Sequence, residues 1–156
     1  MGIEIERRYL VSRDGWQGNW QVQLIKQGYL LRRSECTVRV RCTTDSAWLT
    51  IKGATHGLQR SEYEYSIPLD DASEILDELC GSAIVEKQRF SVVYAGCDWS
   101  VDVFSGRNEG LILAEIELQH ADETFELPEW IGAEVTHDAR YANANLAVHP
   151  MPIASD

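Results

Sequence analysis

The sequence has few basic residues for its length. Its 156 residues include 14 lysines and arginines against 25 aspartates and glutamates, so the formal net charge is −11. A surface of that charge repels phosphate backbones and anionic lipids. We therefore expect neither a nucleic-acid partner nor a membrane partner.

Long apolar runs and export signals are also missing. No hydrophobic stretch approaches the ~20 residues that a membrane-spanning helix needs, and no basic segment followed by an apolar one opens the chain. Position 6 is Glu6 rather than serine or threonine, so Gly2 does not begin a myristoylation signal. The sequence predicts a cytoplasmic protein.

The cysteines and histidines lack the spacings of disulfide frameworks and metal sites. No two cysteines form a C-x-x-C pair, and in a reducing cytoplasm we expect free thiols. The histidines are scattered through predicted loops and chain ends, which disfavours a zinc site. These residues are Cys36, Cys42, Cys80, Cys97, His56, His120, His137 and His149.

Internal repeats and low-complexity tracts are absent as well. A hydrophobic content of 44% and a charged content of 25% are typical of globular proteins, and the length allows a substantial core. We predict a single domain over residues 1–150 and a frayed tail over residues 151–156.

Alternation of polar and apolar residues is the main pattern that is present. Period-two patterning marks strands, because successive strand side chains point to opposite faces. The expected strands cover residues 3–11, 27–31, 37–41, 48–53, 60–65, 84–89, 99–104 and 113–118. Roughly eight strands joined by hairpin-like turns predict an α+β, mainly β domain, either an antiparallel barrel or a strongly curled sheet.

A few short helices are expected beside the strands. They cover residues 12–27, 71–81 and 122–131, with a last one after Asp138. In the first, Trp16 and Trp20 have the i, i+4 spacing of a helix face. The second opens with a capping box from Asp71 to Glu74. The third is interrupted at Pro128, and Asp138 is a good cap for the fourth.

Charged side chains share faces of the predicted strands in matched numbers. Seven are acidic and seven are basic, which leaves 18 acids and 7 bases elsewhere, so the whole net charge lies outside this set. The acids are Glu4, Glu6, Glu62, Glu64, Asp102, Glu115 and Glu117. The bases are Arg8, Arg39, Arg41, Lys52, Arg60, Lys87 and Arg89. This neutral set is expected to have an environment of its own.

The inside of a barrel is one such environment, and solvated sheet faces without a site are the plain alternative. Two like charges ~4 Å apart repel by several kcal/mol at an effective dielectric constant near 20, so carboxylate pairs need cations or protons. Hard cations such as Mg²⁺ and Mn²⁺ take oxygen ligands, and guanidinium and ammonium groups bind oxyanions. A site that offers both carboxylates and basic groups suits a metal-chelated polyphosphate.

The motifs resemble those of the CYTH superfamily, the triphosphate tunnel metalloenzymes. The stretch Glu4-Ile5-Glu6-Arg7-Arg8 is similar to the opening E-x-E-x-K signature. Further matches follow in order at residues 28–30, 38–41, 49–53, 60–65, 87–89, 99–104, 114–118, 134–136 and 138–141. The resemblance thus runs from residue 3 to about residue 148.

The resemblance implies an eight-stranded antiparallel tunnel with a charged interior, flanked by a few short helices. It implies metal-dependent hydrolysis of a triphosphate, foremost inorganic tripolyphosphate, with Mg²⁺ or Mn²⁺ as cofactor. A class IV-like adenylate cyclase, a thiamine triphosphatase and a non-catalytic polyphosphate or nucleotide binder are the alternatives. Members are often dimers, so the resemblance also allows a homodimer.

Individual roles follow from the same resemblance. The matching metal ligands are Glu4, Glu6, Glu115 and Glu117, with Glu62 and Glu64 in support. The matching phosphate-binding residues are Arg8, Arg39, Arg41, Lys52, Arg60, Arg89 and Arg140. Lys87 matches a tunnel lysine thought to help activate water, and Asp102 is expected to support the site. The signature lysine is Arg8 here, which keeps the charge but cannot act as a base.

Overall fold

Nine antiparallel strands frame the protein within residues 2–18 and 21–151, the part of the chain that the computed structural model describes. The strands are β1 (Ile3–Val11), β2 (Gln21–Arg33), β3 (Cys36–Cys42), β4 (Ala47–Gly53), β5 (Gln59–Ser66), β6 (Ile84–Tyr94), β7 (Cys97–Phe104), β8 (Ile112–Glu117) and β9 (Ile131–Glu134). The helices are α1 (Leu69–Glu78), α2 (Asn143–Leu146) and the 3-10 helices η1 (Gly106–Asn108) and η2 (Ala139–Tyr141). No described helix is long and apolar enough to cross a membrane.

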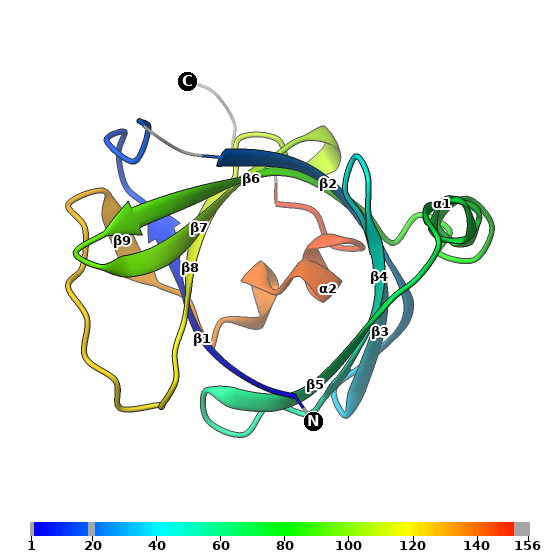
Figure 1. The fold of residues 1–156 in the computed structure, drawn as a ribbon, viewed down its shortest axis with the longest axis horizontal. Helices are drawn as coiled ribbons and strands as arrows, with labels where there is room; N and C mark the ends of the chain where they lie inside the picture. The colour runs from blue at the N-terminus through cyan, green and yellow to red at the C-terminus, as the bar shows by residue number, and fades with distance from the viewer. Residues whose placement is uncertain (1, 19–20, 152–156) are drawn as a thin grey trace.

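The strands close into a ring. Their order is β5-β4-β3-β2-β6-β7-β8-β1-β9, and β5 also pairs with the beginning of β1 (Figure 1). Eight strands therefore form a barrel, while β9 pairs with the end of β1. The predicted eight-stranded antiparallel barrel is confirmed, with one additional strand that the sequence pattern did not indicate.

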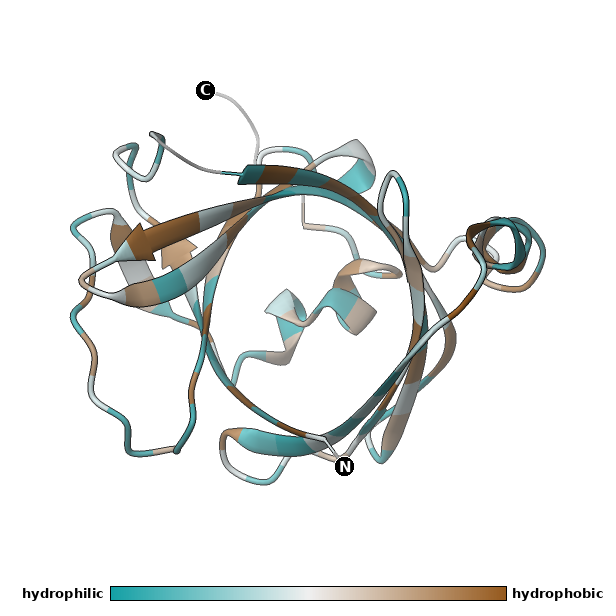
Figure 2. Ribbon diagram, in the orientation of Figure 1, coloured by the Kyte–Doolittle hydropathy of each residue, from teal (hydrophilic) through white to brown (hydrophobic). Residues whose placement is uncertain are grey.

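Strand pairing explains why the charged set points inward. Directly opposed residues of antiparallel strands lie on the same face. Glu6 is opposite Glu117 and Arg8 is opposite Glu115 between β1 and β8, and Lys52 is opposite another acid, Glu62, on β5. Polar and apolar residues alternate along the strands (Figure 2). One face of each strand therefore lines the inside of the barrel.

An aromatic core covers the outer face of β1, β7 and β8. Trp99 is 1% exposed and its ring centroid lies 5.7 Å from Tyr9 and 5.8 Å from both Phe125 and Trp130. Phe125 and Trp130 belong to the loop between β8 and β9. Apolar residues of β8 complete the cluster. The loop thus removes the apolar outer face of these strands from water.

The predicted helix over residues 12–27 is wrong. Residues 12–18 are irregular, and β2 begins at Gln21, pairing with β6 and then with β3. Trp16 is buried, but it packs on Phe90 of β6 at 5.0 Å rather than on a helical neighbour. Trp20 lies outside the described residues. Backbone pairing with two neighbouring strands outweighed the local helical spacing.

The predicted helix over residues 122–131 is also wrong. This segment is an irregular loop followed by β9, and the N–H of Ile131 donates to the carbonyl of Pro128 at 3.1 Å. Proline has no N–H to donate within a helix. Phe125 and Trp130 instead reach the aromatic core from extended backbone, which a single helical face would not allow.

Helix α1 is confirmed, but it begins at Leu69, two residues before the expected cap. Pro68 occupies the N-cap position and no side chain caps the helix, so the predicted capping box does not form. The helix packs Ala72 and Leu76 on the outside of β3 and β4. Its approach depends on Gly28, where a Cβ atom would lie 2.8 Å from the Leu76 and Cys80 side chains.

The last helical segment lies inside the ring rather than beside it (Figure 1). Asp138 caps the 3-10 helix η2 by accepting a hydrogen bond from the N–H of Arg140. The single helix predicted after Asp138 is wrong, however, because α2 begins separately at Asn143 and has no side-chain cap. Helix α2 then places Leu146, which is fully buried, against apolar side chains of β2, β6, β7 and β8. The side chain of Asn108 donates to the carbonyl of Leu146 at 3.1 Å. We call α2 the plug helix, because it fills one end of the barrel.

The plug helix should contribute strongly to stability through Leu146. Truncating a fully buried leucine costs ~2–5 kcal/mol, so Leu146→Ala should lower the free energy of unfolding by that amount in urea titrations. Leu127→Ala is the matched control, since Leu127 is 55% exposed and surface changes stay within ~0.5 kcal/mol. Equal effects of the two substitutions would show that the plug helix does not pack as described.

Candidate active site in the tunnel

A cavity of about 780 Å³ occupies the inside of the barrel. Its lining contains thirteen of the fourteen charged residues that the strand pattern grouped; the remaining one, Asp102, is 1% exposed in the barrel wall. Arg140 does not join them: its side chain is 69% exposed and pairs with Asp138 at 2.7 Å. The structure therefore brings the predicted site residues together with this one exception.

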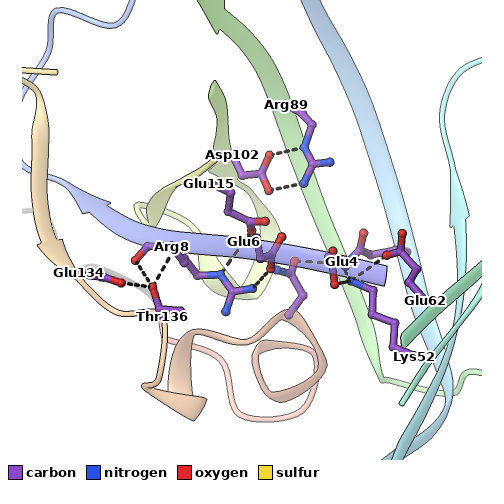
Figure 3. Close-up of polar contacts among 12 residues, drawn as sticks. Glu4, Glu6, Arg8, Lys52, Glu62, Arg89, Asp102, Glu115, Glu134 and Thr136 are labelled. Atoms are coloured by element: carbon purple, nitrogen blue, oxygen red, sulfur yellow. Dashed lines mark hydrogen bonds and ion pairs between the residues drawn. The ribbon is translucent and has the colours of Figure 1, made fainter. Parts of the chain in front are cut away.

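Arg8 links two of the predicted metal ligands. Its Nη2 atom lies 3.1 Å from Glu6 Oε1 and its Nε atom lies 3.4 Å from Glu115 Oε1 (Figure 3). The three residues come from the paired strands β1 and β8. The backbone N–H of Arg8 donates to Thr136 Oγ1 at 3.0 Å, which anchors this part of β1. A lysine could not contact both carboxylates with this forked geometry.

Lys52 holds a second acidic pair. Its Nζ atom lies 2.9 Å from both carboxylate oxygens of Glu4 and 3.3 Å from Glu62 (Figure 3). Farther along the same wall, Glu64 lies 3.6 Å from both Arg39 and Arg41. Each wall of the tunnel thus carries acids and bases in contact.

Asp102 joins two bases on the β6–β7 wall. It accepts two hydrogen bonds from Arg89, at 2.8 and 2.9 Å (Figure 3). Its Oδ2 atom also lies 2.8 Å from Lys87 Nζ. The Lys87 ammonium receives a further contact from Asn143 Oδ1 at 2.9 Å, and it lies over the Phe104 ring. Lys87 is 3% exposed, so these contacts fix its position.

Burial and neighbouring charges shift the pKa values of these carboxyl groups in opposite directions. Burial and the nearby Glu115 and Glu4 raise the pKa of Glu6 well above its usual value. Burial and Glu4 also raise the pKa of Glu117. Burial would raise the pKa of Glu115 too, but Arg8 and Arg89 outweigh it and lower this pKa. The acidic groups near Glu6 therefore carry negative charge that the protein only partly compensates.

The pKa of Lys87 is lowered to about 8. Burial is the largest cause; Asp102 opposes it, and Arg89 adds to it by repulsion. Asp102 shows the converse: burial would raise its pKa, but Lys87 and Arg89 hold it below the usual value. A lysine with this pKa can exchange a proton near neutral pH, unlike an exposed lysine.

The donor atoms of the tunnel fit a hard divalent cation. Glu4, Glu6, Glu115 and Glu117 offer only carboxylate oxygens, the ligands that Mg²⁺ and Mn²⁺ prefer. Within residues 2–18 and 21–151, no three acidic, histidine or cysteine side chains already converge as a metal site. A cation would therefore take carboxylate oxygens that now contact Arg8 and Lys52.

Two residues near Lys87 were not among the predicted site residues. Asn143 lies at the start of the plug helix and lines the tunnel. Gln27 lies on β2, is 1% exposed and donates to Asn143 Oδ1 at 3.2 Å. Neither residue is charged, so the charge pattern could not include them.

A second cavity, of about 650 Å³, is lined in part by Ala144 of the plug helix but not by Lys87. It shares Glu4, Glu6, Arg8 and Arg60 with the first cavity, so the two meet at the carboxylates of β1. Its own lining includes Arg32 and other residues of the β2–β3 turn. The two cavities therefore share charged residues of β1, and α2 borders both of them.

The fold and the site define a class: a closed antiparallel barrel whose interior places carboxylates that suit a hard cation beside bases that suit an oxyanion. A family comparison agrees with this class, since residues 2–149 match the CYTH domain. The chain belongs to the CYTH domain family, which confirms the resemblance found in the sequence.

Relatives with nearly the same length exist. The inorganic triphosphatase of Acetivibrio thermocellus is 45% identical over 150 residues, covering 96% of each chain. The inorganic triphosphatase of Nitrosomonas europaea is 35% identical over 149 residues, covering 93% of this chain and 97% of the relative. A crystal structure of an inorganic triphosphatase superposes with a TM-score of 0.71 at 31% identity, covering 97% of this chain and 98% of that one.

More distant structures show the fold alone. A candidate adenylate cyclase from Bacillus halodurans superposes with a TM-score of 0.58 at 18% identity, and the match covers 78% of this chain and 84% of that one. At that identity the match concerns the barrel and not its chemistry.

Lys87 should make stability depend on alkaline pH. Its folded-state pKa of about 8 lies below the ordinary value of 10.5, so the unfolded chain binds more protons between these limits and stability rises with pH there. The gain should reach about 3 kcal/mol. Urea unfolding at about pH 8 and pH 10.5 should show it in the parent protein and much less in Lys87→Met. Lys26→Met, at an exposed position, should keep the parent's dependence. Parallel curves for the parent and Lys87→Met would contradict the lowered pKa.

Proposed function

We propose that this protein is a metal-dependent triphosphatase that hydrolyses inorganic tripolyphosphate to pyrophosphate and phosphate inside the tunnel. The observation that supports this most is the lining of the 780 Å³ cavity, which contains seven glutamates and seven bases. The inorganic triphosphatases that are 45% and 35% identical over nearly the whole chain give the same substrate. A small triphosphate is therefore the proposed partner.

The bases of the tunnel are the proposed phosphate-binding groups. Arg39, Arg41, Lys52 and Arg89 would hold phosphate oxygens, with Arg8 and Arg60 beside them. In the described part of the chain, the buried Nε atoms of Arg39 and Arg41 have no hydrogen-bond partner. A buried donor without a partner costs about 1–3 kcal/mol. An oxyanion bound in the cavity beside β3 would supply the missing acceptors.

The acids are the proposed metal ligands. Glu4, Glu6, Glu115 and Glu117 would hold Mg²⁺ or Mn²⁺, and Glu62 and Glu64 would support them from β5. A cation bound there supplies neutralisation of phosphate charge and polarisation of the phosphorus–oxygen bonds. Binding would also relieve the repulsion that raises the pKa of Glu6. Arg8 and Lys52 would then be released toward the phosphate oxygens.

Lys87 is the proposed general base. In its neutral form, Nζ accepts a proton from a water molecule whose oxygen attacks a terminal phosphorus in line with the leaving pyrophosphate. The new phosphorus–oxygen bond forms as the anhydride bond breaks, and the arginines stabilise the charge that develops on the leaving group. Asp102 orients Lys87 through their 2.8 Å contact.

The alternative activities, the cellular location and the oligomeric state that the sequence suggested stay predictions. A class IV-like adenylate cyclase or a thiamine triphosphatase would use the same tunnel, and a non-catalytic binder would fill it without reaction. The cytoplasmic location and the homodimer likewise await direct tests. The fold similarity to a candidate adenylate cyclase does not favour that activity, because identity is only 18%.

Phosphate release from tripolyphosphate, ATP and thiamine triphosphate, measured in parallel with Mg²⁺, Mn²⁺ or EDTA, tests the main proposal. We expect fast release from tripolyphosphate with a metal and none with EDTA. Glu117→Gln should lower this rate by ~10²-fold or more, because it removes a proposed anionic ligand. Glu78→Gln, at an exposed position of α1, is the control. Cyclic AMP formed from ATP would instead identify a cyclase, and full turnover by Glu117→Gln would refute the metal assignment.

The role of Lys87 predicts a pH profile. A base acts in its deprotonated form, so the rate should rise with pH through the pKa of about 8. Lys87→Met should lower the rate by ~10²–10⁴-fold and remove this rise. Lys87→Arg keeps the positive charge, but arginine cannot accept a proton as a base. Its rate should therefore fall as far as that of Lys87→Met. A Lys87→Met enzyme that kept the alkaline rise would assign the pH dependence to another group.

A further inference from the structure

The Lys87 ammonium is held from two sides of the barrel. Asp102 on β7 contacts it at 2.8 Å, and Asn143 on the plug helix accepts a hydrogen bond from it at 2.9 Å. The second contact joins residues 56 positions apart in the sequence. The plug helix therefore reaches the proposed base directly, in addition to filling the end of the barrel.

The amide of Asn143 has only one orientation that satisfies its neighbours. Its Oδ1 atom faces Lys87 Nζ, which has no acceptor, and it also accepts a hydrogen bond from Gln27 Nε2 at 3.2 Å. Because both neighbours donate, the oxygen must lie toward them. The Asn143 side chain is thus fixed by hydrogen-bond chemistry.

Gln27 keeps this orientation at a cost. It is 1% exposed, and its Nε2 atom contacts both Asn143 and the hydroxyl of Tyr29, at 3.2 and 3.4 Å. Its Oε1 atom is buried and has no hydrogen-bond partner in the described part of the chain. An unsatisfied buried acceptor costs about 1–3 kcal/mol. The structure therefore keeps the Gln27–Asn143 hydrogen bond although the Oε1 atom of Gln27 is left without a donor.

We propose that Asn143 is a positioning residue that acts through Lys87, with Gln27 behind it fixing the orientation of the Asn143 amide. This proposal rests on the role of Lys87 in the proposed function. It assigns the plug helix a part in the reaction: it aims the base at the water molecule. The plug helix would then both fill the end of the barrel and align the base.

A neutral acceptor suits this position better than a charged one would. Asp102, Arg89 and Glu115 are the charged groups that act on Lys87. One further carboxylate beside the ammonium would stabilise its charged form and keep the proton on it. The amide oxygen of Asn143 orients the ammonium without adding a charge, so Lys87 can still release its proton near neutral pH.

Two substitutions of Asn143 separate positioning from simple structural support. Asn143→Leu keeps the side-chain size but removes the acceptor, so kcat for tripolyphosphate should fall ~10–100-fold while KM changes less than ~3-fold. Asn143→Asp keeps the acceptor and adds charge, so the alkaline rise in rate should move upward by about one pH unit. Asn145→Leu, on the same helix, removes a hydrogen bond to the backbone of residue 139 rather than one to Lys87 and should leave kcat unchanged.

A double-mutant cycle tests whether Asn143 acts through Lys87. In a Lys87→Met background, Asn143→Leu should cause no further loss of kcat, because coupled residues are not additive. An additive loss, or unchanged kcat in the single Asn143→Leu variant while Lys87→Met is impaired, would overturn the proposal. Full activity of Lys87→Met would instead refute the role of Lys87, and no hydrolysis by the parent protein would refute the proposed function.

A measurement without catalysis keeps the test decisive if Asn143→Leu folds poorly. Carbon-13 labelled lysine reports the Lys87 titration by NMR in the absence of metal and substrate. The Lys87 pKa should rise in Asn143→Asp and stay unchanged in Asn145→Leu. An unchanged Lys87 pKa in a folded Asn143→Asp protein would show that residue 143 does not act on Lys87 as proposed.

Discussion

The structure depends on neutralising charge inside a closed barrel. Two like charges ~4 Å apart cost about 4 kcal/mol at an effective dielectric constant of 20, so the seven glutamates that line the cavity need cations between them. The protein provides those cations itself: Arg8 lies between Glu6 and Glu115, and Lys52 lies between Glu4 and Glu62. The interior is an ion-pair network, and binding a metal-chelated polyphosphate would exchange its internal partners for external ones.

The barrel makes this network possible because closure gives every strand a second neighbour. Residues that face inward on β1 meet both β5 and β8: Glu4 is opposite Arg60 on β5, and Arg8 is opposite Glu115 on β8. The outer faces are apolar and need cover, which the loop around Phe125 and Trp130 supplies over Trp99. The plug helix fills one end with Leu146 and, through Asn143, reaches Lys87. The same elements thus stabilise the barrel and shape its interior.

Sequence patterns anticipated the strands better than the segments between them. Period-two alternation located eight strands and the inward set, because a charged residue at every second position is typical of a strand with one polar and one apolar face. The segments 12–27 and 122–131 were predicted as helices from local spacing of aromatic and apolar residues. Their true partners, such as Phe90 for Trp16 and Trp99 for Phe125 and Trp130, are distant in the sequence. Arg140 shared the charge of the site but lies outside it, paired with Asp138.

The sequence by itself determined the barrel strands, the identity of the charged residues and the family, since these follow from periodicity, charge matching and ordered motifs. Only the tertiary structure decided which acid contacts which base, because the closing β5–β1 pair and the registers of the strands set those contacts. It also decided the pKa of Lys87, which depends on burial and on Asp102 and Arg89. The contact of Asn143 with Lys87 arises because α2 lies inside the barrel. This contact joins residues that are distant in the sequence, so no local sequence pattern predicts it.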